Sequence, residues 1–299
     1  MDGAGNGVSP LSEDANPEPS GRYVDLHVHT TASDGERAPA DVVARAARAG
    51  LAAIAITDHD TVAGVAEAEA AGAALGVRVV AGCEFSVDAG WGEMHLLGYF
   101  LPVASAELAD FLSSARADRE RRAREMVEKL VALGVRIDDG MVLAAAAGGA
   151  VGRPHVARAL LDAGAVRSLD DAFDRYLGRG RAAYVEKRLP TFREVTALVH
   201  RLGGVVSAAH LKDRGSRGNL ERLRAAGLDA VETRHPSHDP DTRARLTDLV
   251  LKLRLGRSGG SDWHGEPEGG WSHGALGSQQ VPYEWLEVLE ARRPEAAPC

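Results

Sequence analysis

One stretch near the N-terminus decides the fold of this chain, Tyr23-Val24-Asp25-Leu26-His27-Val28-His29-Thr30-Thr31-Ala32-Ser33-Asp34-Gly35. Apolar and polar residues alternate in its first half, which predicts a β-strand with His27 and His29 on one face and apolar side chains behind them. The second half is typical of a loop, and the acid at its tip, Asp34, could fold back towards the end of the strand. Two imidazole nitrogens and one carboxylate oxygen would suit a divalent metal ion. The alternative is a half-buried strand with two hydrogen-bonded histidines.

The length and composition are ordinary for a soluble globular protein. The 299 residues suffice for one large α/β domain, or for one domain that carries a smaller insertion. Apolar residues make up 44% and charged residues 26% of the chain. The formal net charge of -8 argues against a broad basic surface for nucleic acid, so any nucleic-acid ligand should be small or held at one end.

The cysteines and the N-terminal residues favour a cytoplasmic protein. Only Cys83 and Cys299 are present, too few for a disulfide framework, which fits a reducing compartment. Residues 1–20 have neither a basic start nor an apolar core, so we expect a disordered leader and no signal peptide. The longest apolar run, residues 141–151, is far shorter than the roughly 20 residues that a membrane span requires.

Apolar runs that end in polar residues recur along the chain. They lie near residues 24, 53, 78, 94, 206, 230 and 255, with helical patterns between most of them. Such runs are typical of buried parallel strands, whose polar end residues would gather at the carboxyl edge of the sheet. Seven βα-like units favour a barrel-like α/β fold as the simplest architecture.

The pattern changes between residues 104 and 189. A long amphipathic helix is predicted over residues 108–133, and shorter helical pieces follow. We therefore expect a helical insertion domain at 104–189 and a barrel domain formed by 21–103 and 190–299. Five arginines between Arg116 and Arg124 could attract anionic substrates, but the acids among them favour a solvated helix face.

The candidate metal ligands gather at the predicted strand ends and in the turns just after them. They are His27, His29, Asp34, His59, Glu84, His95, His210, Asp262 and His264. Six of the eleven histidines are among them, and burying so many imidazoles and carboxylates together without cations would be costly. Two or three divalent ions remove that cost, and nitrogen and oxygen donors without cysteine suit Mn, Fe or Zn at an open catalytic site.

The two oxygens of Glu84 could bridge two ions. Two ions a few ångströms apart can hold a hydroxide between them and polarise the bonds of a phosphoryl group. The predicted reaction is therefore hydrolysis, and phosphate esters are the leading class of substrate.

The ordered motifs resemble those of one known family. They are Asp25-Leu26-His27-Val28-His29, Ser33-Asp34-Gly35, Thr57-Asp58-His59-Asp60, Glu84, His95, His210 and Gly260-Ser261-Asp262-Trp263-His264-Gly265. Over residues 23–277 the chain is similar to the PHP (polymerase and histidinol phosphatase) family. The resemblance implies a distorted seven-stranded barrel with a di- or trinuclear metal site, and every ligand position of the pattern is filled.

The resemblance also implies how the ligands are shared between the ions. One ion would be held by His27, His29, Glu84 and Asp262, a second by Asp34, His59 and His264, and a third by Glu84, His95 and His210. We expect Mn in these sites, with Fe, Zn or Mg as alternatives.

Within the family, the chain is similar to small phosphoesterases whose helical insertion carries a Gly152-Arg153-Pro154-His155 motif. That branch includes 3',5'-nucleoside bisphosphate phosphatases and a 5'-to-3' exoribonuclease acting on short RNA. Arg153 is either a phosphate clamp, because a guanidinium fork matches phosphate oxygens, or a surface arginine beside a helix start. His155 could orient the phosphate or protonate the leaving group, or it could cap or pack locally.

Other polar residues near the expected site have less defined roles. Asp58 could fix the tautomer of a ligand through a hydrogen bond, or be a simple turn acid. Glu232, His235 and His238 could serve the substrate, but we expect them to line a loop. Cys83 is expected to be a small core residue.

Three functions are compatible with these motifs. The leading hypothesis is a metal-dependent phosphoesterase that acts on a nucleotide with two phosphates or trims short RNA from its 5' end. Histidinol-phosphate phosphatase is a related alternative, and a non-catalytic PHP module accessory to a DNA polymerase is an alternative of another class. The filled ligand positions disfavour the last. The expected partner is a small phosphorylated nucleotide or short RNA, without a stable nucleic-acid complex or a membrane.

Overall fold

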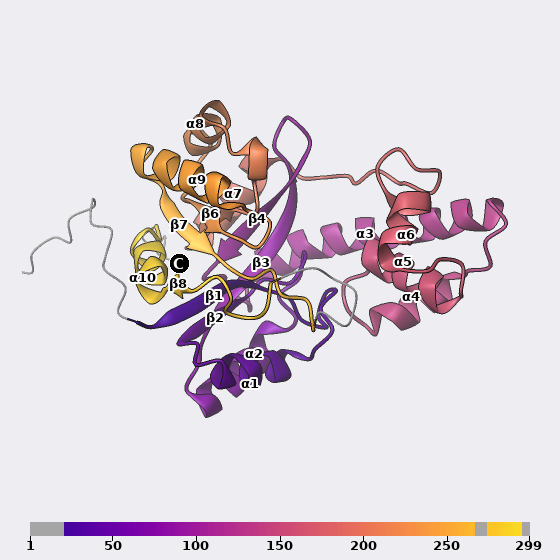
Figure 1. Ribbon diagram of the computed structural model, residues 1–299, viewed down its shortest axis with the longest axis horizontal. Coiled ribbons are helices and arrows are strands. Elements are labelled where there is room, and N and C mark those ends of the chain that lie inside the picture. Colours follow the sequence, from indigo (N-terminus) through magenta and orange to yellow (C-terminus); the bar gives the residue numbers. More distant parts are fainter. Residues whose placement is uncertain (1–20, 267–273, 295–299) are drawn as a thin grey trace, which may run out of the picture.

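The computed structural model describes residues 21–266 and 274–294, so the expected leader at 1–20 lies outside the described part of the chain. Figure 1 shows a curled sheet with a helical segment that projects from one side of it. Within the described residues the sheet has eight strands, in the order β7-β6-β5-β4-β3-β2-β1-β8. Their bounds are β1 Tyr23–Val28, β2 Ala53–Ile56, β3 Arg78–Asp88, β4 Glu93–Tyr99, β5 Val205–Ala208, β6 Ala230–Arg234, β7 Gly256–Gly259 and β8 Val281–Pro282.

The sheet forms a nearly closed barrel, which confirms the predicted α/β fold class. The N–H of His29, just beyond β1, donates to the carbonyl of Trp263, beyond β7, over 2.9 Å. Seven strands lie near the predicted places, and β8 is an addition that pairs antiparallel with β1. Because β8 has only two residues, it leaves no alternation that sequence reasoning could detect.

The direction of the strands decides which ends meet at the site. β1, β2 and β3 are parallel, as are β5, β6 and β7, but β4 is antiparallel to both neighbours. The carboxyl ends of the parallel strands therefore meet the start of β4, where His95 lies opposite Ser86. β3 also continues past Glu84. The expectation of a site residue at each strand's carboxyl end is thus wrong for His95 and Glu84.

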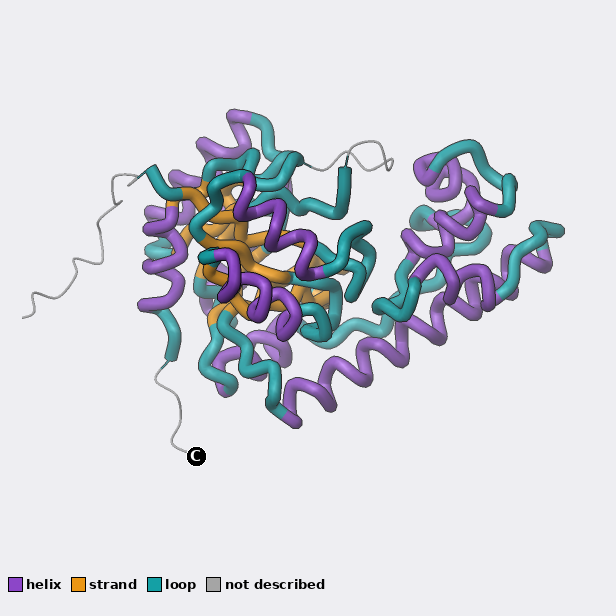
Figure 2. Tube along the Cα trace, turned by 90° about the horizontal axis from the view of Figure 1, so that it is seen from below, coloured by secondary structure: helices purple, strands orange, loops and turns teal. Residues whose placement is uncertain are grey.

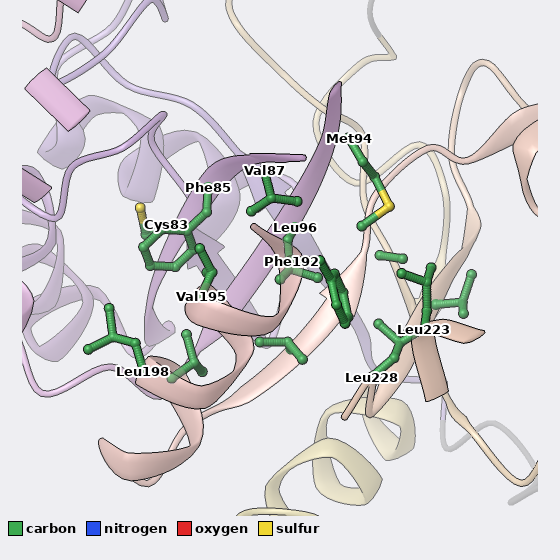
Figure 3. Close-up of a cluster of buried hydrophobic side chains, with 14 of the residues drawn as sticks. Cys83, Phe85, Val87, Met94, Leu96, Phe192, Val195, Leu198, Leu223 and Leu228 are labelled. Atoms are coloured by element: carbon green, nitrogen blue, oxygen red, sulfur yellow. The ribbon is translucent and has the colours of Figure 1, made fainter. Parts of the chain in front are cut away.

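Helices cover the outside of the barrel and bury its apolar faces. They are α1 Pro39–Arg48, α2 Val65–Leu75, α7 Phe192–Arg201, the 3-10 helix η2 Lys212–Arg214, α8 Arg217–Ala225, α9 Pro240–Lys252 and α10 Tyr283–Ala291. Figure 3 shows a core cluster in which Phe85 and Leu96 of the β3–β4 hairpin pack with Phe192 of α7. Cys83 is buried in the same cluster, as expected of a small core residue.

The segment between β4 and α7 is helical. Its elements are α3 Ala106–Ala132, α4 Asp139–Ala146, α5 Arg153–Asp162, α6 Leu169–Ala172 and the π-helix η1 Phe173–Leu177. They share a core of their own, in which Met126 and Leu130 of α3 belong to one cluster with Leu160 of α5. The segment projects from the barrel in both views, and α3 connects the two (Figures 1 and 2). We keep 104–189 as a proposed insertion domain, and 21–103 with 190–299 as the proposed barrel domain. None of the described helices combines the length and the apolar character of a membrane span.

Candidate metal centre

Glu84 lies at the centre of the predicted ligand cluster and is completely buried. Its Oε2 approaches three imidazole nitrogens, His27 Nε2 at 3.2 Å, His29 Nε2 at 3.1 Å and His59 Nδ1 at 3.2 Å. Its Oε1 approaches two more, His95 Nδ1 at 2.8 Å and His210 Nε2 at 3.1 Å. One carboxylate thus joins five histidines that four separate parts of the barrel sequence supply.

Two aspartates complete the cluster. Asp262 Oδ1 lies 3.3 Å from the Nε2 atoms of both His27 and His29. Asp34 does fold back from its loop, and its Oδ1 lies 3.4 Å from His264 Nε2. The structure therefore brings together all nine predicted ligands. Possible ligand atoms lie within 4.8 Å of one another in the groups His29-Asp34-His59-His264, His27-His29-Glu84-Asp262 and His59-Glu84-His95.

Several buried polar atoms of the cluster have no hydrogen-bond partner among the described residues. They are His27 Nε2, His29 Nε2, His59 Nδ1, Asp34 Oδ1 and Glu84 Oε2. Buried atoms of this kind cost free energy unless something satisfies them. Divalent ions bind imidazole nitrogens and carboxylate oxygens at the same time, so the residues present fit such ions.

The protonation of the cluster supports the same conclusion. Burial alone would lower the pKa of His29, but the carboxylates of Asp262 and Glu84 raise it to about 10. Burial alone would raise the pKa of Glu84, yet the charges of His59, His95 and His27 together hold it well below its usual range. The pKa values of His27, His29 and His95 are raised, so protons on these imidazoles help balance the buried carboxylates, whereas burial lowers the pKa of His59 and of His210. Bound metal ions would displace those protons.

Two arginines of α3 are buried beside the cluster, which corrects the expectation of a solvated helix face. Arg119 and Arg122 are only 8% and 3% exposed, whereas Arg124 is exposed. Arg119 Nε donates to Asp60 Oδ2 over 2.7 Å. This ion pair attaches α3 to the turn that carries His59.

A cavity of about 200 Å³ lies between the cluster and the helical segment. Seven of the nine predicted ligands line it on the side of the barrel. The side of the helical segment contributes Arg119, Arg122, Arg153 and Lys187. A carboxylate- and imidazole-rich wall thus faces a cationic wall, and an anionic substrate bound to metal ions would meet both.

Comparison with known proteins identifies the family. The family model described as the PHP domain matches residues 25–222, more than half of the chain. The chain belongs to the PHP domain family. Two PHP relatives are similar over most of their length. A 5'-3' exoribonuclease of Haemophilus influenzae is 34% identical over 246 residues, 80% of this chain and 89% of the relative. A 3',5'-nucleoside bisphosphate phosphatase of Chromobacterium violaceum is 35% identical over 254 residues, 83% of this chain and 89% of the relative.

A solved structure supports the assignment to the PHP family. A Bifidobacterium adolescentis protein assigned as a metal-dependent phosphoesterase superimposes with a TM-score of 0.85 at 32% identity, over 93% of this chain and 99% of that chain. This PHP protein is therefore an enzyme of the metal-dependent phosphoesterase class.

Asp58 supports the loop that carries Asp34 in the candidate metal centre. Its carboxylate accepts hydrogen bonds from Thr30 N at 2.8 Å, Thr30 Oγ1 at 2.7 Å and Ser33 Oγ at 2.6 Å. Ser33 Oγ lies 3.5 Å from His29 Nδ1, so Asp58 reaches a candidate ligand through one hydroxyl group. This chain of contacts supports a role in orienting His29.

The turn after β7 requires a glycine to bring Asp262 against β1. A Cβ atom on Gly260 would lie 2.4 Å from the Cβ of His27, which no ordinary packing allows. Asp262 itself has φ 52°, in the left-handed region where aspartate is tolerated better than most residues. His210 has φ 30° and is less common there, so its surroundings impose this conformation.

Glu232 and His235 contact candidate ligands of the metal centre, so the expectation that they only line a loop is wrong. Glu232 lies within β6, is fully buried, and accepts a hydrogen bond from His27 Nδ1 over 3.1 Å. His235 Nε2 lies 3.3 Å from Asp262 Oδ2. His27, Glu232 and His235 form a further group of possible ligands. His238 is buried beside His235, with 5.5 Å between the ring centroids. The signal in the sequence that could have revealed Glu232 is its position directly after a buried apolar pair.

Glu232→Gln is expected to weaken metal binding about 10- to 100-fold. The amide has nearly the size of the carboxylate but cannot hold the ring of His27 by a charge-assisted hydrogen bond. Calorimetric titration of the metal-free variant with Mn²⁺ measures this Kd. Glu287→Gln, at an exposed position of α10, is the matched control. Equal Kd values for both variants would show that Glu232 does not position His27.

The two motif residues of the insertion differ in their surroundings. Arg153 is the first residue of α5 and lines the cavity between the two walls. His155 lines a neighbouring cavity, and its Nδ1 accepts a hydrogen bond from Gly152 N over 2.9 Å. Burial lowers the pKa of His155. A neutral imidazole that caps its own helix agrees with the alternative in which His155 caps or packs locally.

Proposed function

We propose that this enzyme hydrolyses a phosphate ester of a nucleotide, either a 3',5'-nucleoside bisphosphate or a short 5'-phosphorylated RNA. The observation that carries the proposal is the cavity in which the Glu84 cluster faces four cationic side chains. Phosphate oxygens suit both walls, because divalent ions bind them on one side and guanidinium groups donate to them on the other. The two relatives described above are named for these two kinds of activity.

The proposed metal sites follow the grouping of the ligands. They are His27, His29, Glu84 and Asp262 for one ion, Asp34, His59 and His264 for a second, and Glu84, His95 and His210 for a third. We propose Mn as the working ion, ahead of Fe, Zn or Mg. When bound, the ions would supply polarisation of the phosphoryl oxygens and a lowered pKa for a water molecule.

The side chains of this protein would hold and orient the substrate. The position of Arg153 on the cavity wall supports its role as a phosphate clamp, since its guanidinium can donate two parallel hydrogen bonds. The capping contact of His155 favours a positioning role over proton transfer.

Histidinol-phosphate phosphatase is the alternative enzyme function. The cytoplasmic location stays a prediction.

A panel of three substrates tests the proposal. Manganese-loaded protein is incubated with adenosine 3',5'-bisphosphate, a 5'-phosphorylated oligoribonucleotide and histidinol phosphate. We expect hydrolysis of at least one of the first two at a higher kcat/KM than that of histidinol phosphate. Asp34→Ala is the inactive reference, because it removes a proposed ligand. No hydrolysis of either nucleotide, together with an unchanged metal content in Asp34→Ala, would contradict the proposal.

A further inference from the structure

The ring nitrogen of His95 that points away from the metal cluster contacts Glu93, the first residue of β4. His95 Nδ1 faces the cluster, where it lies 2.8 Å from Glu84 Oε1. His95 Nε2 lies 3.4 Å from Glu93 Oε1. Because a metal ion would bind the unprotonated Nδ1, the proton of the neutral ring belongs on Nε2, from which it donates to the carboxylate of Glu93. Each nitrogen of this imidazole therefore has its own partner.

A lysine of the helical segment binds the same carboxylate of Glu93. Lys187 lies between η1 and α7, and its Nζ forms an ion pair with Glu93 Oε1. Nζ also donates to Ser86 Oγ over 3.0 Å, and Ser86 lies opposite His95 in the pairing of β3 with β4. The Lys187 side chain is only 12% exposed, so salt in the solvent screens this ion pair weakly. Lys187 thus fixes Glu93 from the side of the helical segment.

The backbone that follows Lys187 is attached to the barrel as well. Asp88 N, at the end of β3, donates to Pro190 O over 2.8 Å, and Asp88 also forms a bridge with Thr191. Figure 1 shows the connection from the helical segment to α7 passing close to the hairpin of β3 and β4. Because the chain is already fixed here, holding Lys187 against Glu93 costs less conformational entropy than it would in a free loop.

We propose that Glu93 is a positioning residue of the metal centre, which orients His95 towards the third proposed ion and is itself oriented by Lys187. This inference rests on the proposed function, since His95 is a ligand only if that ion binds. A carboxylate on the outer nitrogen of a metal-binding histidine fixes both the ring and its tautomer. At His95 the contacts begin in the helical segment, so this segment supports a metal ligand in addition to facing the substrate.

Calorimetric titration of the metal-free protein with Mn²⁺, without substrate, tests the proposal. Glu93→Gln is expected to weaken the binding of one ion about 10- to 100-fold and to leave the other sites unchanged. The amide keeps the size of the side chain but lacks the charge that holds His95 Nε2 and the ammonium group of Lys187. Lys187→Met is expected to weaken the same ion about 5-fold, because Glu93 stays but loses the cation that fixes it. Lys187→Met also serves if Glu93→Gln does not fold.

Glu221→Gln is the matched control, since Glu221 is an exposed glutamate that accepts a hydrogen bond from Arg217 Nε over 2.8 Å. It should bind every ion as the unmodified protein does. Unchanged Kd values in Glu93→Gln, or an equal weakening of all sites, would overturn the positioning role, and hydrolysis by the unmodified enzyme would still support the proposed function. An unmodified protein that neither binds Mn²⁺ nor hydrolyses a nucleotide would overturn both.

Discussion

Glu84→Gln is expected to abolish phosphate release and most metal binding. The substitution keeps the shape of the side chain, but it exchanges one acceptor oxygen for an NH₂ group that cannot bind a metal ion. Because Glu84 approaches five histidines, two of the three proposed metal sites lose a ligand at once. We expect hydrolysis to fall about 10³-fold, which corresponds to about 4 kcal/mol of transition-state stabilisation.

Two measurements on the same sample check this expectation. Elemental analysis gives the number of bound ions per chain, and phosphate release gives the activity. Glu107→Gln, an exposed glutamate at the start of α3, is the matched control and should change neither. A Glu84→Gln enzyme that keeps both its metal content and its activity would exclude Glu84 as the central ligand.

Asp60→Asn is expected to destabilise the protein by about 3–5 kcal/mol. Asp60 accepts hydrogen bonds from Arg119 Nε at 2.7 Å and from Ser86 N at 3.1 Å, and both members of the ion pair are buried. The amide leaves the guanidinium of Arg119 buried without a counter-charge. Asparagine tolerates the φ of 50° at this position, so the effect reports the charge and not the backbone.

Urea unfolding measures the free energy of unfolding of this variant. Asp118→Asn is the control on α3, because Asp118 pairs with Arg121 near the surface and its loss should cost no more than about 1 kcal/mol. The double variant Asp60→Asn with Arg119→Met should recover part of the loss, since no unpaired charge stays buried. Equal losses for Asp60→Asn and Asp118→Asn would show that the buried pair does not stabilise the fold.

Local patterns were sufficient to predict seven of the eight strands in the described part of the chain and the nine residues that gather around Glu84. His27 and His29 alternate with apolar residues, which is the period of a strand with one functional face. Asp34, His59 and His210 follow apolar runs, and parallel strands bring such ends together whatever their distance along the chain. The fold class and the family are confirmed. That the nine residues bind metal ions stays a prediction, which their grouping in the structure supports.

Contacts between distant segments could not be predicted in the same way. Arg119 and Arg122 alternate with acids along α3, the pattern of a solvated face, and only the return of the helical segment onto the barrel buries them. Glu232 lies in a short strand, where nothing local indicates that its partner is His27. The antiparallel direction of β4 likewise depends on pairing that the residues of β4 alone do not reveal.

Titration of metal-free protein with Mn²⁺ tests the metal dependence of hydrolysis most directly. Bound ions per chain and phosphate release are measured in the same samples, with whichever nucleotide substrate the enzyme hydrolyses faster. We predict no release from the metal-free protein and full activity once two or three ions are bound per chain. Full activity without bound metal, or two bound ions without any release, would contradict a catalytic metal cluster around Glu84.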